Sequence, residues 1–235
     1  MQMKFENIYP LTPTQEGIYF QSMLNHGGDL YIIQNTFKLK NKLNRPIIEK
    51  SIKHLFKRYP VLKTSFITLK NGKTKQVIVD KRDGEYKWFE FKFNYADKDL
   101  KAILEKDLSR GFDLKDDCLF RVIYIQFFDL QFLIFSFHHI IIDGWSSQRI
   151  IGDFFNFCEG KNLEEISVEV FPKYIKWIKN RDYDSELAYW NGLLGNYNEM
   201  CKIPELGYKN LHLKSSFEMK QKKISMTISS LRLNY

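Results

Sequence analysis

The sequence has few cysteines and no long apolar run. Its three cysteines, Cys118, Cys158 and Cys201, lie far apart and form no CxxC or Cys/His metal spacing. Such sparse thiols exclude a disulfide scaffold and indicate a reduced, cytoplasmic compartment. The longest apolar stretch, residues 130–142, is interrupted by polar residues and is too short to span a bilayer. Because residues 1–6 also lack a signal-peptide pattern, we expect a cytoplasmic protein without a membrane anchor.

The chain also lacks a concentrated block of charge. Its 36 basic and 28 acidic residues give a net charge of +8, but the lysines are mostly single residues beside apolar ones. The tightest basic run, residues 220–223, is short, and no zinc-finger, RNP or helix-turn-helix spacing accompanies it. This pattern predicts a solvated surface and no nucleic-acid binding, although steering of an anionic partner such as a phosphopantetheine arm stays open.

Apolar periodicity predicts a mixed helix and strand protein. Hydrophobic residues make up 44% of the chain and aromatic residues 16%, which favours a folded, sheet-rich core. A capping box at residues 12–15 opens a helix that runs to residue 24. The other expected helices are 44–59, 97–109, 146–157 (with Ser146 or Ser147 as its cap), 172–181 and 184–194. The expected strands are 31–39, 61–69, 74–79, 86–93, 119–127, 131–137, 211–217 and 223–228.

Residues 138–144 carry the most specific pattern: two histidines at a strand end, three apolar residues, then Asp-Gly before a helix. Successive side chains of an extended chain point to opposite sides, so one histidine can belong to the scaffold while the other faces a cleft. Gly144 permits a tight turn or a close backbone approach, and Asp143 can stabilise that turn or pair with a cation. A neutral imidazole is suited to take a proton from an amine or hydroxyl that attacks a thioester, which predicts acyl transfer with His139 as the catalytic residue.

Two other interpretations of the histidine pair compete with acyl transfer. The histidines could be structural, or they could bind a metal; we expect no metal because adjacent histidines diverge and no third ligand is suitably spaced. No GxSxG motif or nearby cysteine marks a covalent nucleophile, which favours direct transfer between two bound partners. His26, His54 and His212 are isolated and are expected to be structural or exposed.

With these residues, the chain resembles the condensation domains of nonribosomal peptide synthetases, in the chloramphenicol-acetyltransferase-like superfamily. Residues 138–146 match the family's HHxxxDG signature. Further segments agree with other family motifs in order and spacing: residues 9–17, 58–66, and 174–177 with 189–190. The resemblance implies an α+β fold, a two-layer α/β sandwich with helices flanking a mixed central sheet. It covers only the family's N-terminal lobe, expected at residues 1–195, with residues 196–235 starting the connection to a missing C-terminal lobe.

The resemblance also implies a reaction and its partners. Condensation domains form an amide between a carrier-bound thioester donor and a carrier-bound aminoacyl acceptor. Both substrates would therefore arrive on the phosphopantetheine arms of partner carrier proteins, with no cofactor bound directly by this chain. Without the second lobe, the isolated chain is expected to be inactive. The alternatives are an O- or N-acyltransferase that uses a soluble CoA thioester, and a non-catalytic fragment that binds a carrier protein.

The family's site residues carry over by position. His139 corresponds to the histidine that acts as a base or positions the attacking amine, while His138, Asp143 and Gly144 correspond to structural positions. Lys63 stands where the family has an arginine that pairs with the aspartate, and a lysine cannot form the same bidentate pair. The two residues after the glycine, Trp145 and Ser146, are candidates for the wall of the substrate tunnel.

Overall fold

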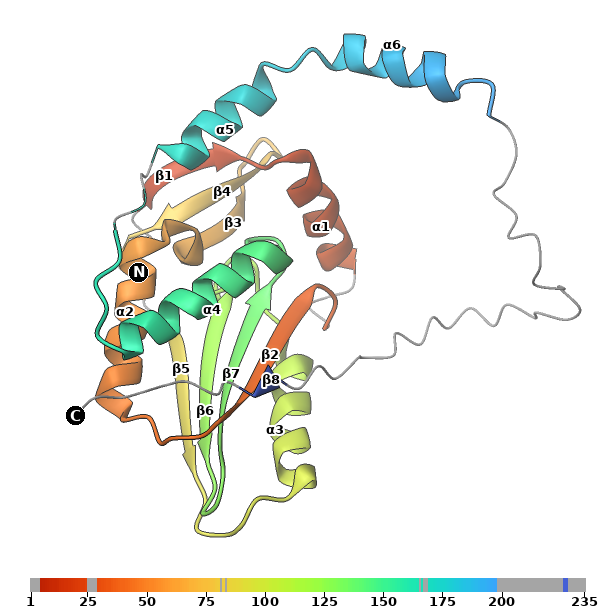
Figure 1. The fold of residues 1–235 in the computed structure, drawn as a ribbon. Coiled ribbons are helices and arrows are strands. Elements are labelled where there is room, and N and C mark those ends of the chain that lie inside the picture. Colours follow the sequence, from red (N-terminus) through yellow and green to blue (C-terminus); the bar gives the residue numbers. More distant parts are fainter. Residues whose placement is uncertain are drawn as a thin grey trace, which may run out of the picture. The chain divides into compact units, whose positions relative to one another are not determined.

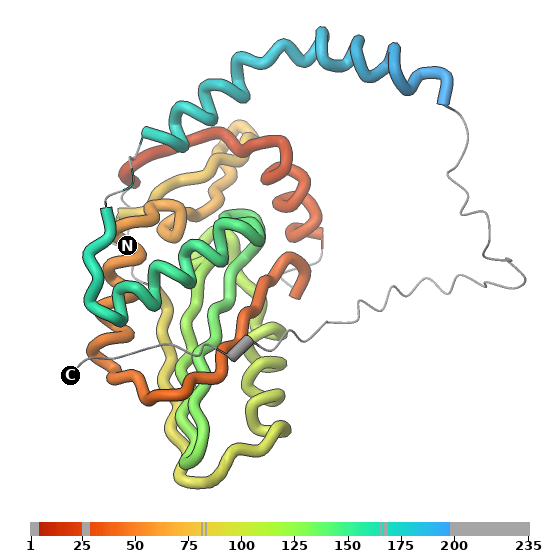
Figure 2. The backbone as a smooth tube through the Cα atoms, viewed as in Figure 1, coloured from red at the N-terminus to blue at the C-terminus, as the bar shows by residue number. Residues whose placement is uncertain are grey.

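The computed structural model describes residues 5–24, 29–80, 82, 84–164, 166, 169–197 and 226–227. The chain divides into two compact units, one of Met1–Ile175 with Ser225–Tyr235 and one of Lys176–Ile224. Figure 1 shows the elements as a ribbon, and Figure 2 follows the backbone as a tube. Strands of the first unit form two sheets, ordered β1-β4-β3 and β5-β6-β7-β2-β8. The predicted α+β class is confirmed.

The five-stranded sheet is mixed, as expected. It contains β5 (Glu85–Glu90), β6 (Phe120–Gln126), β7 (Gln131–His138), β2 (Ile32–Leu39) and β8 (Met226–Thr227). The β5–β6 and β2–β8 pairs are parallel, whereas β6–β7 and β2–β7 are antiparallel. Every residue of β7 is buried, because this strand lies between two neighbours and both of its faces are covered.

Helices cover both faces of this sheet (Figure 1). On one face, α2 (Arg45–Arg58) and α4 (Gly144–Cys158) share an apolar cluster with the strands. On the other face, α3 (Asp97–Arg110) packs in a second cluster. The period-2 alternation of β7 explains the division, since Phe135 belongs to the first cluster and Ile134 to the second.

The three-stranded sheet joins β1 (Phe5–Pro10), β4 (Thr74–Val79) and β3 (Thr64–Thr68), all antiparallel, and α1 (Pro13–Leu24) follows β1. Strand β1 was not predicted from the sequence. The predicted start of the strand at 61–69 was also wrong, because residues Pro60–Lys63 form a 3-10 turn before β3 begins.

Several predicted signals at element ends are confirmed. The capping box of α1 forms: the Gln15 N–H donates to Thr12 Oγ1 at 3.2 Å, and the Thr12 N–H donates to Gln15 Oε1 at 3.0 Å. Gly72, in the β3–β4 hairpin, and Gly111, at the end of α3, have φ angles of 78° and 65°. That left-handed region favours glycine.

The last described helices are α5 (Val170–Lys179) and α6 (Tyr183–Leu194), close to their expected positions. The boundary between the two compact units falls within α5. The strand expected at 211–217 lies outside the described residues, and of the one expected at 223–228 the structure describes β8. In the part of the chain that is described, no helix is both long and apolar enough to cross a membrane.

Candidate functional site

The two histidines lie at the end of β7, where three backbone hydrogen bonds fix the chain. The His138 N–H donates to the Leu119 carbonyl at 3.0 Å, and the His139 N–H donates to the Tyr31 carbonyl at 2.7 Å. The Ile141 N–H then donates back to the His138 carbonyl at 3.2 Å and closes a turn. We call residues 138–143 the histidine turn. Its first two residues are bonded to the segments that precede β6 and β2, the strands on either side of β7.

The His138 imidazole is part of the scaffold. It is 3% exposed, and its Nδ1 accepts a hydrogen bond from the Ile140 N–H at 3.2 Å. Burial, and then the charge of His139, lower the pKa of His138 to about 4, so the ring is neutral near pH 7. Because Nδ1 is the acceptor, the ring proton is on Nε2, which faces Ser22 Oγ at 3.5 Å. His138 therefore has no free basic nitrogen.

The neighbouring His139 side chain is more accessible. It is half-buried, in contrast to the fully buried His138. Within the described residues, no side-chain hydrogen bond of His139 is found, whereas its backbone N–H is fixed. The two imidazoles thus differ as the alternation of an extended chain predicts. Of the two, His139 has the more solvent-accessible side chain.

Asp143 caps α4, which corrects the expectation that Ser146 or Ser147 would do so. Its Oδ1 accepts a hydrogen bond from the Ser146 N–H at 2.7 Å, and that bond holds the pKa of Asp143 below its ordinary value. The Ser147 hydroxyl instead donates to the Gly144 carbonyl at 2.8 Å. Of the two roles expected for Asp143, local backbone bonding or pairing with a cation, the structure shows the first.

Gly144 does not have the backbone role that was expected. It is the first residue of α4, and its φ is not in the left-handed region. A Cβ added to Gly144 would meet no atom of the described chain within 4 Å. Neither a strained turn nor a close internal approach therefore requires glycine at this position.

The expected ion pair between Lys63 and Asp143 is not formed. Lys63 Nζ lies 2.8 Å from the carboxylate of Glu6 on β1, and Asp143 is occupied by the N-terminus of α4. Another residue of the same motif contacts α4 instead. Arg58 Nε donates to Asp153 Oδ2 at 2.8 Å, with both side chains largely buried. The segment of residues 58–66 therefore contacts α4 through Arg58 and not through Lys63.

A long-range contact of Gln15 was not predicted from the sequence. The Gln15 Nε2 donates to the Ile140 carbonyl at 3.1 Å, so α1 is bonded directly to the histidine turn. The capping box marked Gln15 only as a local helix signal. No sequence pattern indicates a partner 125 positions away.

A cleft of about 750 Å³ lies beside the His138 ring. Met23 of α1, Phe66 of β3 and Phe112, which follows α3, contribute apolar lining. His139, Trp145 and Ser146 do not line it. Trp145 is 89% exposed and Ser146 is also exposed, at the start of α4. The cleft is therefore bordered by His138 and not by His139.

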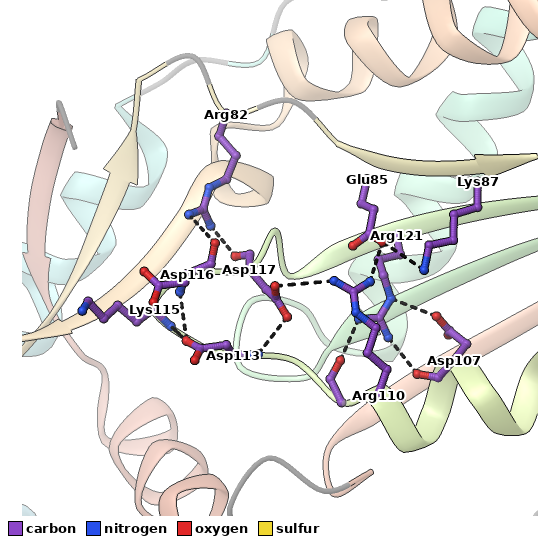
Figure 3. A network of polar contacts seen from close by, with 11 residues as sticks. Arg82, Glu85, Lys87, Asp107, Arg110, Asp113, Lys115, Asp116, Asp117 and Arg121 are labelled. Carbon is purple, nitrogen blue, oxygen red and sulfur yellow. Dashed lines mark hydrogen bonds and ion pairs between the residues drawn. The ribbon is translucent and has the colours of Figure 1, made fainter. Parts of the chain in front are cut away.

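A polar network holds the loop after α3, which forms one wall of the cleft (Figure 3). Asp113 Oδ1 accepts hydrogen bonds from the N–H groups of Lys115, at 2.8 Å, and Asp116, at 2.9 Å. Asp117 Oδ2 accepts one from the Asp113 N–H at 3.0 Å. Arg82 donates to the carbonyl oxygens of Asp116 and Asp117. The loop is thus fixed largely by its own side chains.

A buried ion pair ties this loop to the sheet. Arg121 of β6 is 1% exposed, and its Nε lies 2.9 Å from Asp107 Oδ1 of α3 (Figure 3). Its Nη1 donates to the Gly111 carbonyl at 2.7 Å, and its guanidinium carbon lies 3.8 Å from the centre of the Phe112 ring. The Ser136 hydroxyl donates to Asp107 Oδ2 at 2.5 Å. Both charges are therefore compensated, as burial requires.

The described part of the chain contains neither a metal-binding group nor a disulfide. No group of three or more His, Cys, Asp or Glu side chains there could hold a metal ion. Cys118 and Cys158 are both free, and burial raises the pKa of the Cys158 thiol to about 12. A thiol in that state is a poor nucleophile at neutral pH.

Comparisons with known proteins agree with this geometry. The family model described as "Condensation domain" matches residues 5–232. One of the linear gramicidin synthase subunits of Brevibacillus parabrevis is 32% identical over 216 residues, which cover 88% of this chain and 4% of that protein. Bacitracin synthase 3 of Bacillus licheniformis is 28% identical over 209 residues, 86% of this chain and 3% of that protein. The chain therefore spans only a small part of these curated relatives.

Solved structures share the fold. The starter condensation domain of rhizomide synthetase RzmA superposes with a TM-score of 0.71 at 17% identity, covering 83% of this chain and 49% of that one. The first condensation domain of the calcium-dependent antibiotic synthetase gives a TM-score of 0.67 at 14% identity, with 83% and 49% covered. This chain thus spans about half of these solved domains. Together, the family match over residues 5–232, the fold and the HHxxxDG turn show that the chain belongs to the condensation-domain family.

Proposed function

We propose that this chain provides the histidine-bearing lobe of an enzyme that forms an amide bond between a carrier-bound thioester and a carrier-bound aminoacyl acceptor. The observation that carries the proposal is the difference between the two histidines. His138 is neutral, buried and bonded at Nδ1, so it supports the turn. His139 follows it with an accessible imidazole.

In this proposal His139 acts on the attacking amine. The imidazole accepts a proton from the amine as the nitrogen attacks the thioester carbonyl; the C–S bond then breaks, and the proton passes to the departing phosphopantetheine thiolate. Alternatively, the imidazole orients the amine for attack, a role that needs the same position of His139. General-base help of this kind typically accelerates a reaction about 10²–10⁴-fold. Asp143 and His138 maintain the turn, and no covalent intermediate on this chain is involved.

The substrates come from partners, and a second lobe would supply the other wall of the site. Both thioesters would be carried on phosphopantetheine arms of carrier proteins in the cytoplasm, and this chain would bind no cofactor directly. We place the lobe at residues 1–195 and the start of its connection at 196–235. Trp145 and Ser146, exposed at the start of α4, would line the tunnel once a second lobe covers them. The chain alone is expected to be inactive.

A chimera tests this function. Residues 5–195 replace the matching segment in a condensation domain of the linear gramicidin synthase relative, and amide formation is measured with two loaded carrier proteins. The chimera should form the amide, its His139→Ala variant should lose at least about 100-fold in rate, in line with the value of general-base catalysis, and the 235-residue chain alone should be inactive. A folded chimera whose rate does not depend on His139 would refute the proposal.

A second candidate is acyl transfer from a soluble CoA thioester. It is favoured by one observation: solved structures of the rhizomide synthetase starter condensation domain, which share this fold, are described as complexes with C8-CoA. Offering the chimera an acyl-CoA donor in place of the donor carrier separates the two. Turnover with acyl-CoA and none with the donor carrier would select this alternative.

A further inference from the structure

Both backbone polar groups of Ile140, the residue after His139, are hydrogen-bonded to side chains. The Ile140 N–H donates to His138 Nδ1 at 3.2 Å, and the Ile140 carbonyl accepts from Gln15 Nε2 at 3.1 Å. Ile140 is 3% exposed, so water does not replace these partners easily. The direction of the chain beyond His139 therefore depends on a residue of α1.

The orientation of the Gln15 amide is fixed by its other partners. Its Oε1 accepts the Thr12 N–H at 3.0 Å and Gln76 Nε2 at 2.9 Å. Because the Thr12 N–H can only donate, the atom that faces it must be the oxygen, and the NH₂ group must face Ile140. The Nε2 also lies 3.1 Å from Gln76 Oε1, which makes the two amides a reciprocal pair.

Gln76 anchors this pair in the three-stranded sheet. It lies on β4, is 1% exposed, and donates from Nε2 to the Pro10 carbonyl of β1 at 2.7 Å. The Gln15 side chain is therefore held by the Thr12 backbone and by Gln76 of β4, which is itself bonded to β1. Because these partners already restrict the Gln15 side chain, it loses little conformational entropy when it bonds to Ile140.

We propose that Gln15 is a positioning residue for His139: its amide, paired with Gln76, fixes the Ile140 carbonyl and thereby the direction of the His139 side chain. This deepens the function proposed above and rests on it for the effect on turnover. The structural part of the inference is independent of any reaction.

Gln15→Glu removes the bond to the Ile140 carbonyl together with the bond from Gln15 Nε2 to Gln76 Oε1, which belongs to the same amide pair. A glutamate at this position keeps the acceptor that completes the capping box with the Thr12 N–H, but a carboxylate has no hydrogen to donate to the Ile140 carbonyl. Thr12→Ala is the matched control, because it removes the other half of the same capping box and leaves the bond between Gln15 and Ile140 in place.

The first measurement is amide hydrogen exchange in the 235-residue chain, and it needs no activity. We expect the Ile140 N–H to exchange at least tenfold faster in Gln15→Glu, relative to the Phe135 N–H of β7, which reports any global loss of stability. Thr12→Ala should leave this ratio unchanged. The second measurement is made in the chimera, where Gln15→Glu should lower kcat at least tenfold with KM for both carriers unchanged, and Thr12→Ala should keep kcat.

Equal effects of Gln15→Glu and Thr12→Ala on the exchange ratio would overturn the positioning role. If the chimera with Gln15 intact forms no amide, the proposed function fails instead, and the exchange ratio still decides the structural inference.

Discussion

The end of β7 and the start of α4 are close in the sequence and opposite in character. All eight residues of β7 are buried, and its last side chain, His138, has a partner at each ring nitrogen. Residues 143–146 are all exposed, and Gly144 faces open space. On the buried side of the histidine turn, residues of this chain supply the hydrogen-bond partners. The exposed side presents the accessible imidazole and the features that a substrate or a second lobe would contact.

The largest expected difference between the two sides is in turnover. His139→Ala should lower amide formation in the chimera by about 10²–10⁴-fold, because it removes the side chain that we propose acts on the attacking amine. The free energy of unfolding should change by less than about 0.5 kcal/mol, since the half-buried side chain has no hydrogen bond in the described structure. Rate and urea unfolding are measured together. His54→Ala, on α2, serves as the control that should keep its rate, and a large loss of stability in His139→Ala would contradict this division.

The buried side should be most sensitive to the loss of a charge. Arg121→Met should destabilise the fold by about 3–5 kcal/mol, because Asp107 would stay buried without its cation. Arg45→Ala removes an ion pair of similar length, 2.9 Å to Glu49, on an exposed helix face, and should leave the free energy of unfolding almost unchanged because solvent screens the pair. Urea unfolding of both variants checks this, and similar losses would contradict the burial argument.

His138 should make stability depend on pH. Its folded pKa of about 4 lies below the ordinary value of 6.5, so protons bind the unfolded chain more readily. The contribution is complete above pH 6.5 and is lost as the pH falls toward 4, by about 3 kcal/mol in total.

The His138→Asn variant isolates this effect. Its side-chain oxygen can still accept the Ile140 N–H but does not titrate, so the difference between the parent and the variant should shrink as the pH falls from 6.5 to 4. Unfolding curves across that range measure it, and a constant difference would show that His138 is not a buried neutral base.

Gly144→Ala should have the smallest effect on the fold. Because the added Cβ meets no atom within 4 Å and the residue begins α4, stability should stay the same or rise by about 0.4–1 kcal/mol. Turnover of the Gly144→Ala chimera indicates whether a substrate or a second lobe occupies the space beside this residue. A rate loss of tenfold or more at unchanged stability would indicate a substrate or second lobe close to Gly144, and an unchanged rate would indicate that glycine is not needed there.

Periodicity and capping predicted most elements of the fold, because these signals are local. The sequence did not reveal β1, whose residues mostly face solvent and show no regular alternation. The prediction of Ser146 or Ser147 as the cap of α4 was wrong, because Asp143 is also a favourable cap residue and the backbone of the turn places it at the cap.

The candidate site was predictable only in part, for a similar reason. The HHxxxDG spacing identified the histidine turn and the divergence of its side chains. The partners of Lys63 and Gln15 could not be predicted, because each depends on a tertiary contact. Lys63 reaches Glu6 on the strand that the sequence did not reveal, and Gln15 bonds to Ile140 across 125 positions.

The bond between Gln15 and Ile140 also bears on how condensation domains can be recombined. Any crossover point placed between α1 and β7 takes the amide from one parent and the carbonyl from another, and it can also separate Gln15 from its Gln76 partner. A junction after α4, at residue 158 or beyond, inherits the whole assembly from a single parent. Recombination of this chain with a related domain should therefore take Gln15, Gln76 and Ile140 from the same parent.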